Sequence, residues 1–209
     1  MYGPTHFDES RVDVMHGLIE THPLGTLVLH GEAGLSADHI PFEIAAPTSE
    51  APFGVLRAHV ARANPLWRQG GQQAMVVFQG PGAYVSPAHY AEKAISGKVV
   101  PTWNYAAVHA HGVLRAIEDP AWVLALLDRL TTRHEGARAM PWSVHDAPRE
   151  FLDQLLKVIV GIEIPIDRMQ GKWKVSQNRS QQDQDTIVAG LAADPTSAAH
   201  AALMRQRRA

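Results

Sequence analysis

Hydrophobic and polar residues alternate along much of the chain in patterns typical of β-strands, with a smaller number of segments at helical spacing. The pattern predicts strands over 24–30, 35–46, 53–60, 73–79 and 158–166, and a long extended stretch over 101–117. The short turn 31–34 joins the first two strands, which indicates a hairpin. Most of the predicted sheet is therefore made of strands that follow one another closely.

Helices are predicted between and after these strands. Asp8 is expected to cap a first helix that ends at His22-Pro23, and Asn64-Pro65 to open a short helix that reaches about Gln69. Ser86-Pro87 could start another short helix through Lys93. Further helices are expected from Asp119-Pro120 with apolar residues to Leu130, over 148–157, over 181–193 and over 198–205.

Hairpins with a few helices between them favour an antiparallel barrel with peripheral helices, an α+β fold. The spacing does not suggest parallel βαβ units. The segment 136–146 is the most loop-like interior stretch, so a linker would lie there. We expect a single domain over 1–180 and a helical C-terminal extension over 181–209.

Composition excludes several classes of protein. The 209 residues are 45% hydrophobic and 19% charged, with no cysteine and a net charge of -2. Disulfides and thiolate chemistry are thereby excluded, and no overall basic field attracts nucleic acid. The one basic cluster is Arg205, Arg207 and Arg208, which is also typical of a solvated helix end. Without an apparent signal peptide or an apolar run of membrane length, the sequence predicts a soluble cytoplasmic protein with no membrane contact.

Two runs, 78–87 and 100–105, combine aromatic rings, amide or hydroxyl groups and Pro/Gly residues, with a Pro/Gly corner expected after 79. A core strand does not require Trp, Asn and Tyr in succession beside a proline. Flat rings next to neutral hydrogen-bond donors suit a planar polar ligand. The first hypothesis is therefore a cofactor pocket.

Two further segments could bind phosphate. In 57–65 a strand ends and a helix begins, so free N–H groups and a nearby arginine could hold an anion. The alternative is a capped helix with surface arginines. Segment 172–179 follows a predicted strand and carries two lysines, a tryptophan and neutral donors. It could close a pocket over a flat ring or bind phosphates, and it could equally be a solvated turn.

Twelve histidines raise the possibility of a metal site. His109 with His111 on one strand face, and His30 with His39 across the first hairpin, are the candidate pairs. No carboxylate or third histidine stands at a metal-binding spacing nearby, so no metal site is expected. The sequence also lacks a nucleophile elbow, a P-loop and a Rossmann fingerprint.

Taken together, these runs resemble the PaiB family of FMN-binding negative transcriptional regulators. The resemblance covers most of the chain, and its order and spacing are more specific than any one motif. It is carried by Met1-Tyr2, Pro4, His6-Phe7, His39-Ile40-Pro41-Phe42, 59–65, 78–81, 84–87, Tyr90, 100–105, 108–109, Gly112 and 174–179. Two positions depart from the family pattern: Ala58 stands where glycine is expected, and His89 where an aromatic residue, usually tryptophan, precedes Tyr90.

The resemblance implies a split β-barrel similar to that of pyridoxamine phosphate oxidases, usually a homodimer with FMN at the subunit interface. It implies that Arg62 and the helix start at Asn64 face the phosphate, and that His39, His59 and Val60 line the flavin. Trp103 and Asn104 would come from the same or the partner subunit. Lys174, Gln177 and Asn178 would seal the site.

Three functions are consistent with this reading. The first is an FMN-binding homodimer that regulates transcription, although charge does not support DNA contact. The second is an FMN-dependent oxidoreductase of unknown substrate, because FMN itself carries the electron chemistry and no acid–base pair is required. The third is a haem-binding protein on the same barrel. The sequence identifies no catalytic residue and does not decide whether the protein is an enzyme.

Overall fold

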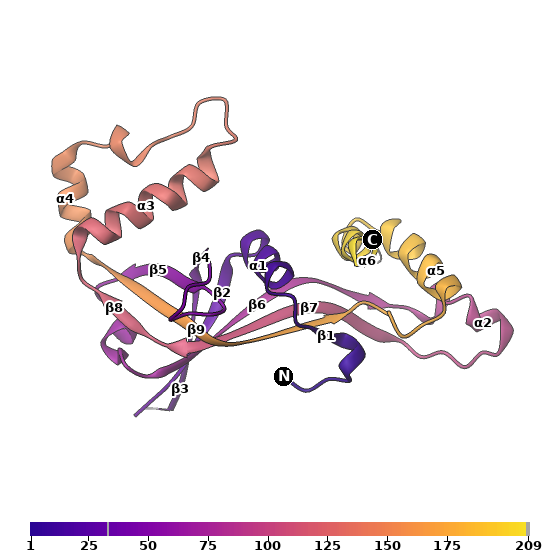
Figure 1. Cartoon of the computed structure of the whole chain (residues 1–209). Helices are drawn as coiled ribbons and strands as arrows, with labels where there is room; N and C mark the ends of the chain where they lie inside the picture. Colours follow the sequence, from indigo (N-terminus) through magenta and orange to yellow (C-terminus); the bar gives the residue numbers. More distant parts are fainter. Residues whose placement is uncertain (33, 208–209) are drawn as a thin grey trace. The chain divides into compact units, whose positions relative to one another are not determined.

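The computed structural model describes residues 1–32 and 34–207. Within them, nine strands form an antiparallel sheet in the order β3-β2-β6-β7-β9-β5-β4, and β1 and β8 pair with β9 beside this path (Figure 1). The order ends at β3 on one side and β4 on the other, so the described sheet does not close on itself. The fold is an α+β split barrel with peripheral helices, which confirms the predicted class.

The strands are β1 Asp8–Glu9, β2 Leu24–Gly31, β3 Gly34–Pro41, β4 Glu43–Ala45, β5 Val55–Ala61, β6 Gln73–Val85, β7 Thr102–Val113, β8 Arg115–Ile117 and β9 Ile159–Lys174. The α-helices are α1 Val12–Thr21, α2 Glu92–Ile95, α3 Pro120–Glu135, α4 Arg149–Lys157, α5 Gln181–Ala192 and α6 Ala198–Gln206. Short 3-10 helices are η1 Thr5–Phe7, η2 Pro65–Gln69, η3 Pro87–His89 and η4 Val144–Asp146. None of the helices in the described ranges combines the length and apolar character needed to cross a membrane.

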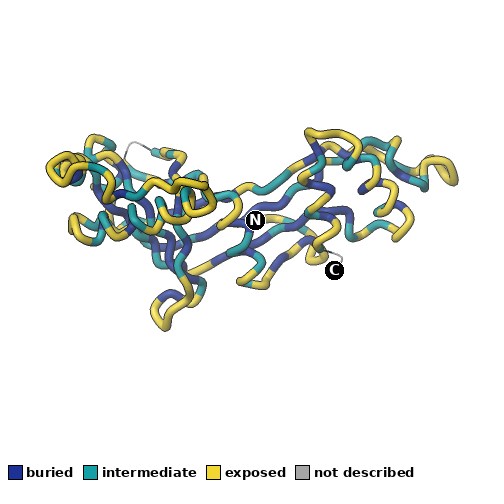
Figure 2. The backbone as a smooth tube through the Cα atoms, turned by 90° about the horizontal axis from the view of Figure 1, so that it is seen from above, coloured by how far each residue is buried: buried dark blue, intermediate teal, exposed yellow. Residues whose placement is uncertain are grey.

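The chain forms two compact units, and β6, β7 and β9 contribute residues to both. Unit 1 contains 1–18, 78–109 and the described chain from 170 onward; unit 2 contains the described residues of 19–77 and 110–169. In both units the buried residues concentrate along the strands, and the exposed residues along the connecting loops (Figure 2). Each unit therefore has a strand-based core of its own.

Unit 2 contains the predicted first hairpin. Strands β2 and β3 pair from Leu24 opposite Pro41 to Gly31 opposite Gly34. The expected turn includes Ala33, which lies outside the described residues. The candidate pair His30 and His39 are not cross-strand partners, because His30 lies opposite Leu35 and His39 opposite Thr26.

Helix α3 packs on the sheet of unit 2 through a glycine. A Cβ atom on Gly161 of β9 would lie 2.5 Å from a ring carbon of Trp122, so only glycine admits this close approach. Asp119 caps the helix by accepting a hydrogen bond from Ala121 N at 2.9 Å, and Pro120 occupies its first turn. The cap and the first turn were both predicted from the sequence.

In unit 1, helices cover one face of the strands. A Cβ atom on Gly171 of β9 would lie 2.9 Å from Met15 Sδ of α1, and the buried His200 of α6 contacts the carbonyl oxygen of Pro81 at 3.1 Å. Strand residues on this face, such as Val85 and Trp173, are buried. The other face of the same strands carries the exposed residues of β6 and β7 discussed below.

The predicted Pro/Gly corner after Gln79 is wrong, because β6 runs without a break from Gln73 to Val85. Its buried positions change phase, from Val76 and Phe78 before the Pro/Gly segment to Ala83 and Val85 after it. An extra residue at a β-bulge has this effect on alternation. A Cβ atom on Gly82 would lie 3.4 Å from the backbone oxygen of Asn104, an ordinary contact distance, so Gly82 lies beside β7 within the strand and not in a turn.

The end of the last strand was also predicted wrongly. β9 continues to Lys174 instead of stopping at 166, so Lys172–Lys174 lie in a strand and not in a turn. The burial pattern changes phase at the exposed pair Asp167–Arg168, which hides the continuation from a search for simple alternation. Asp8 is not a helix cap, since it pairs with Lys172 as part of β1.

Smaller differences concern how elements are divided. The strand predicted over 35–46 is split into β3 and β4, and the stretch 101–117 into β7 and β8. The short helix expected over 86–93 is split into η3 and α2. The helices predicted over 148–157, 181–193 and 198–205 correspond to α4, α5 and α6.

Candidate functional site

Three aromatic rings and two lysines lie on the face of unit 1 that the helices do not cover, which we call the aromatic–lysine face. Trp103 and Tyr105 alternate on β7, and Lys172 and Lys174 on β9, so each pair shares a face. The Lys172 ammonium lies 5.3 Å from the centre of the Tyr105 ring, and Tyr84 of β6 meets Trp103 edge to face at 6.1 Å. The two contacts join Lys172 to Tyr105 and Tyr84 to Trp103, and Lys174 lies close enough to Tyr105 and Lys172 to interact with both electrostatically.

The rings on this face are accessible. Trp103 is 61% exposed although Asn104 after it is buried, and Tyr84 is 50% exposed although Ala83 and Val85 on either side of it are buried. An exposed tryptophan beside an exposed tyrosine provides a flat apolar surface with polar edges. Such a surface suits a planar ring.

The two ammonium groups bind neutral oxygens. Lys172 Nζ donates to the carbonyl oxygen of Tyr2 at 2.9 Å, and Lys174 Nζ donates to Thr102 Oγ1 in a short hydrogen bond. Burial, reinforced by the nearby charge of Lys172, lowers the pKa of Lys174, although the Tyr105 side chain acts in the opposite direction. Since both acceptors are uncharged, this corner of the face is electropositive and suited to an anion.

Asn104 does not share this face with its neighbour Trp103. Alternation turns its side chain to the covered side of β7, where it is only 1% exposed and Nδ2 donates to Ser176 Oγ at 2.8 Å. Among the described residues, its buried Oδ1 atom has no hydrogen-bond partner. The structure thus separates two residues that the sequence grouped.

Gln177 and Asn178 lie in the turn that follows β9. Gln177 folds back on the chain, accepting from Val175 N at 2.9 Å and donating to the carbonyl oxygens of His6 and Trp173. Its amide therefore holds the N-terminal segment and the end of β9 together. Asn178 is exposed in the turn that follows.

The remaining predicted residues lie in unit 2. His39 is exposed on β3 and its Nδ1 contacts Thr26 Oγ1 at 3.2 Å, while Val60 is buried in β5 opposite Val160. Burial lowers the pKa of His59, and its buried Nδ1 has no hydrogen-bond partner in the described part of the chain. His59 is therefore a neutral ring with an unused polar atom.

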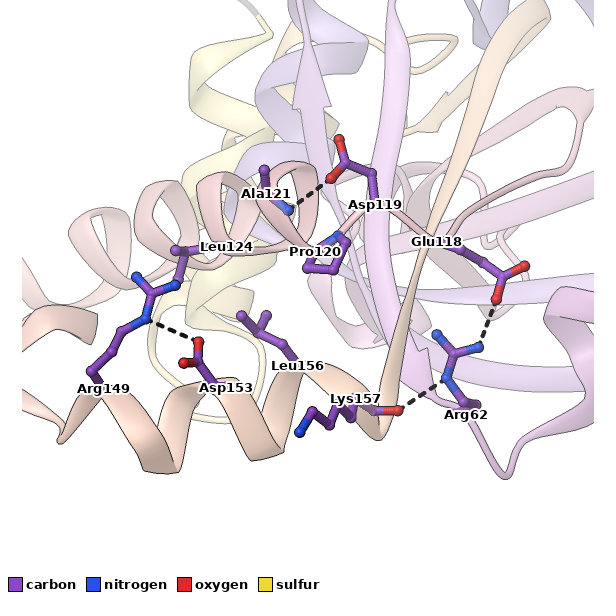
Figure 3. Close-up of a pocket in the computed structure, with 10 residues that line it drawn as sticks. All are labelled: Arg62, Glu118, Asp119, Pro120, Ala121, Leu124, Arg149, Asp153, Leu156 and Lys157. Atoms are coloured by element: carbon purple, nitrogen blue, oxygen red, sulfur yellow. Dashed lines mark hydrogen bonds and ion pairs between the residues drawn. The ribbon is translucent and has the colours of Figure 1, made fainter.

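Arg62 lines a cavity of about 800 Å³ between α3 and α4 (Figure 3). Its guanidinium pairs with Glu118 at 2.6 Å, donates to the Lys157 carbonyl oxygen at 3.1 Å and lies over the Trp67 ring. Apolar side chains from both helices, including Leu124 and Leu156, also line the cavity. Arg62 would have to leave Glu118 to bind a phosphate with its full charge.

Asn64 is occupied by its own helix and by a neighbouring strand. Its Oδ1 accepts from Leu66 N at 3.0 Å, and its Nδ2 donates to Asp38 Oδ1 at 2.9 Å. Pro65, at the first position of η2, has no N–H group. The cap predicted at Asn64 is confirmed, and it uses an N–H group that a phosphate would otherwise bind.

The ten predicted contact residues thus fall into two groups, one in each unit. Unit 1 holds Trp103, Asn104, Lys174, Gln177 and Asn178; unit 2 holds His39, His59, Val60, Arg62 and Asn64. Tyr84, Tyr105 and Lys172 were not among the predicted contacts. The two tyrosines stood in the motif runs, and alternation from Trp103 and Lys174 could have identified Tyr105 and Lys172.

Comparison with known proteins identifies the family. A family described as "Putative FMN-binding domain" matches residues 1–168. The chain belongs to this FMN-binding family. It is 30% identical to "Protease synthase and sporulation protein PAI 2" of Bacillus subtilis, over 91% of this chain and 89% of that protein. The predicted membership of the PaiB family is therefore confirmed.

Two further similarities agree with this. An uncharacterised protein of Emericella nidulans is 36% identical, over 88% of this chain and 87% of its own. The solved structure of an FAD- and haem-binding protein from Mycobacterium smegmatis covers 88% of this chain and 80% of its own, with a TM-score of 0.60 and 19% identity. At that identity the structural likeness supports the fold alone.

FMN is the cofactor of the family, and the side chains present fit its chemistry. Its planar ring requires apolar walls and its phosphate requires cations, and the aromatic–lysine face offers Trp103, Tyr105 and Lys174 for these needs. Loaded FMN would supply hydride and electron transfer. In the described ranges, no group of three or more histidines or carboxylates is arranged to hold a metal ion.

Proposed function

We propose that the aromatic–lysine face contacts the FMN of this family member, and that the flavin-bearing protein is a homodimer that regulates transcription in the manner of PaiB. The observation that carries the placement is the combination of an exposed Trp103 with a lysine whose ammonium is bound to a neutral hydroxyl. Stacking on the tryptophan favours a planar ligand, and the ammonium groups favour a negatively charged one. A face that only contacts solvent would need charged residues but not the exposed aromatic rings.

Two kinds of interaction would hold the cofactor: aromatic contacts and charge-assisted hydrogen bonds. Aromatic contacts contribute about 0.5–1.5 kcal/mol per pair beyond the area that they bury. A charge-assisted bond from Lys174 to an anionic oxygen contributes about 1.5–3 kcal/mol. Lys174 would orient the ligand, and Trp103 would exclude water from one side of it.

Dimerisation is proposed because the same face exposes apolar area beyond what one flat ring covers. Val100, which precedes Trp103 by three residues in the chain, is 63% exposed, and Trp103 and Tyr84 are exposed as well. Large exposed apolar patches mark ligand or protein contacts. A second copy of the chain is the proposed partner, and the cytoplasm the proposed location.

A regulatory role rests on family resemblance, and the charge of the chain gives it little support. Within the described C-terminus, Arg207 lies 3.6 Å from the buried carboxylate of Glu9, so this arginine is engaged inside unit 1. Arg208 lies outside the described residues. DNA contact would rely on Arg205 and on a surface created by the dimer.

Titration with FMN tests the placement. The wild-type protein should bind FMN and shift its visible absorption bands, and Lys174→Met should weaken binding about tenfold or more through loss of one charge-assisted bond. Lys98→Met, an exposed lysine on the loop before β7, is the matched control and should bind normally. Equal affinity in Lys174→Met and wild type would remove the face from the proposal.

Further measurements separate the functions. Sedimentation should give twice the chain mass for the homodimer. Salt-dependent binding to a promoter fragment supports the regulator, while turnover with NADH or NADPH supports an FMN-dependent oxidoreductase. The binding of FAD and haem by the Mycobacterium smegmatis neighbour gives a reason to look for a Soret band, which would favour haem.

A further inference from the structure

Ser176 has a backbone conformation that its side chain disfavours. Its φ angle is +61°, and it is the one non-glycine residue with positive φ in the described ranges. It is also buried, with 4% exposure, two residues after the end of β9. A serine in the left-handed conformation costs free energy, which contacts with its surroundings must offset. Residues of this kind concentrate at functional sites.

Asn104 makes a contact that can stabilise Ser176 in this conformation. Its Nδ2 donates to Ser176 Oγ at 2.8 Å, and both side chains are buried. The bond joins β7 to the residue at which β9 turns, across 72 positions of sequence. Because neither group can turn to water, breaking the bond leaves a buried polar atom unpaired and frees the turn.

The turn held at Ser176 is adjacent to the aromatic–lysine face. Lys174 precedes Ser176 by two residues, and its ammonium is bound to Thr102, which precedes Asn104 by two residues on β7. Gln177 follows Ser176 and accepts from Val175 N at 2.9 Å. Two hydrogen bonds, Asn104–Ser176 and Thr102–Lys174, thus link the end of β9 and the turn after it to β7.

We propose that Asn104 is a positioning residue that does not touch FMN: it holds Ser176 in the left-handed conformation and so fixes Lys174 at the face that binds the cofactor. This inference rests on the proposed function for its effect on FMN. It assigns Asn104 a different role from the cofactor contact that its neighbour Trp103 would suggest. It also explains why a strained serine stands where glycine would be free of strain.

A double-mutant cycle tests the inference. Asn104→Ala should weaken FMN binding about tenfold, because Ser176 loses its hold. Ser176→Gly accepts the left-handed conformation unaided, so adding it to Asn104→Ala should restore FMN affinity to within about threefold of wild type. If Asn104 contacts FMN directly, the double variant binds as weakly as Asn104→Ala, and the inference is overturned.

A second measurement needs no cofactor. The backbone N–H of Val175 donates to Gln177 Oε1, and that of Arg179 to the Ser176 carbonyl oxygen. Exchange of these two amide hydrogens in cofactor-free protein should be about tenfold faster in Asn104→Ala and should return toward the wild-type rate in the double variant. Unchanged exchange in Asn104→Ala overturns the inference. If the wild type binds no FMN but exchange follows this pattern, the proposed function fails while the hold of Asn104 on Ser176 stands.

Discussion

The imidazole of His89 lies against Gly190, in the space that a side chain at position 190 would fill. A Cβ atom there would come within 2.1 Å of His89 Nδ1 and 2.7 Å of its Cγ. Gly190 belongs to α5, which also supplies Asp183 to accept the backbone N–H of Glu92 at 3.0 Å. Helix α5 therefore packs directly on the segment that carries His89, a position at which the resemblance predicts an aromatic ring.

Gly190→Ala should destabilise the protein by about 1–3 kcal/mol, because an overpacked site must shift its neighbours. Urea unfolding measures the change. Gly17→Ala is the matched control: it is also helical, a Cβ there would meet nothing within 4 Å, and it should stabilise the protein by about 0.5–1 kcal/mol.

The role of His89 is checked in the same background. Adding His89→Ala to Gly190→Ala should recover part of the lost stability, since it removes the ring that the new methyl group meets. An equal loss of stability with and without the histidine would show that the contact is not the cause.

Local signals predicted elements whose ends are set by neighbouring residues. Asp119-Pro120 and Asn64-Pro65 were identified as helix starts because a capping side chain and a proline act within one turn. The ends of β6 and β9 were missed for the opposite reason. Gly82 is a strand residue because β7 approaches it, and Lys172 because β1 pairs with it, and neither partner is visible in the local sequence.

In the candidate site, too, local features could be predicted from the sequence, whereas contacts between distant strands could not. Strand alternation could have placed Trp103 and Asn104 on opposite faces of β7. It could not have placed Lys172 against Tyr105, or Ser176 against Asn104, because these contacts depend on which distant strands are neighbours. The family motifs identified the residue types, whereas the pairings required the fold.

His200 makes stability depend on pH. Burial lowers the pKa of this fully buried ring, although its contact with the Pro81 carbonyl acts in the opposite direction. The folded protein therefore binds this proton less well than the unfolded chain, whose histidines have a pKa of about 6.5. Above about pH 6.5 His200 is neutral in both the folded and the unfolded protein, so its titration does not reduce stability there. Below that pH the unfolded chain binds the proton more readily, and the free energy of unfolding should fall.

His200→Asn keeps a donor for Pro81 but cannot titrate, so the slope of unfolding free energy against pH below about 6.5 should be shallower than in wild type. His59, whose pKa burial also lowers, adds to the wild-type slope with the same sign. Identical slopes in His200→Asn and wild type would contradict this assignment.

Arg62 and Glu118 offer a separate test of the phosphate role predicted for Arg62. If Arg62 bonds the FMN phosphate, Arg62→Ala should weaken FMN binding by about 1.5–3 kcal/mol. Glu118→Gln should then bind FMN at least as tightly as wild type, because it releases the guanidinium at a cost in stability of at most about 1 kcal/mol.

Arg149→Ala is the control for this pair, since Arg149 lines the same cavity and is paired with Asp153 at 2.9 Å. Its FMN affinity should match wild type. Normal FMN affinity in Arg62→Ala would remove Arg62 from the cofactor site, without bearing on the aromatic–lysine face.

A crystal structure of the FMN-loaded protein tests the central claim most directly. We predict that the isoalloxazine ring lies against Trp103 and Tyr105, with Lys174 within hydrogen-bond distance of an FMN oxygen. The account is contradicted if FMN is bound elsewhere while both rings and the lysine remain free of it.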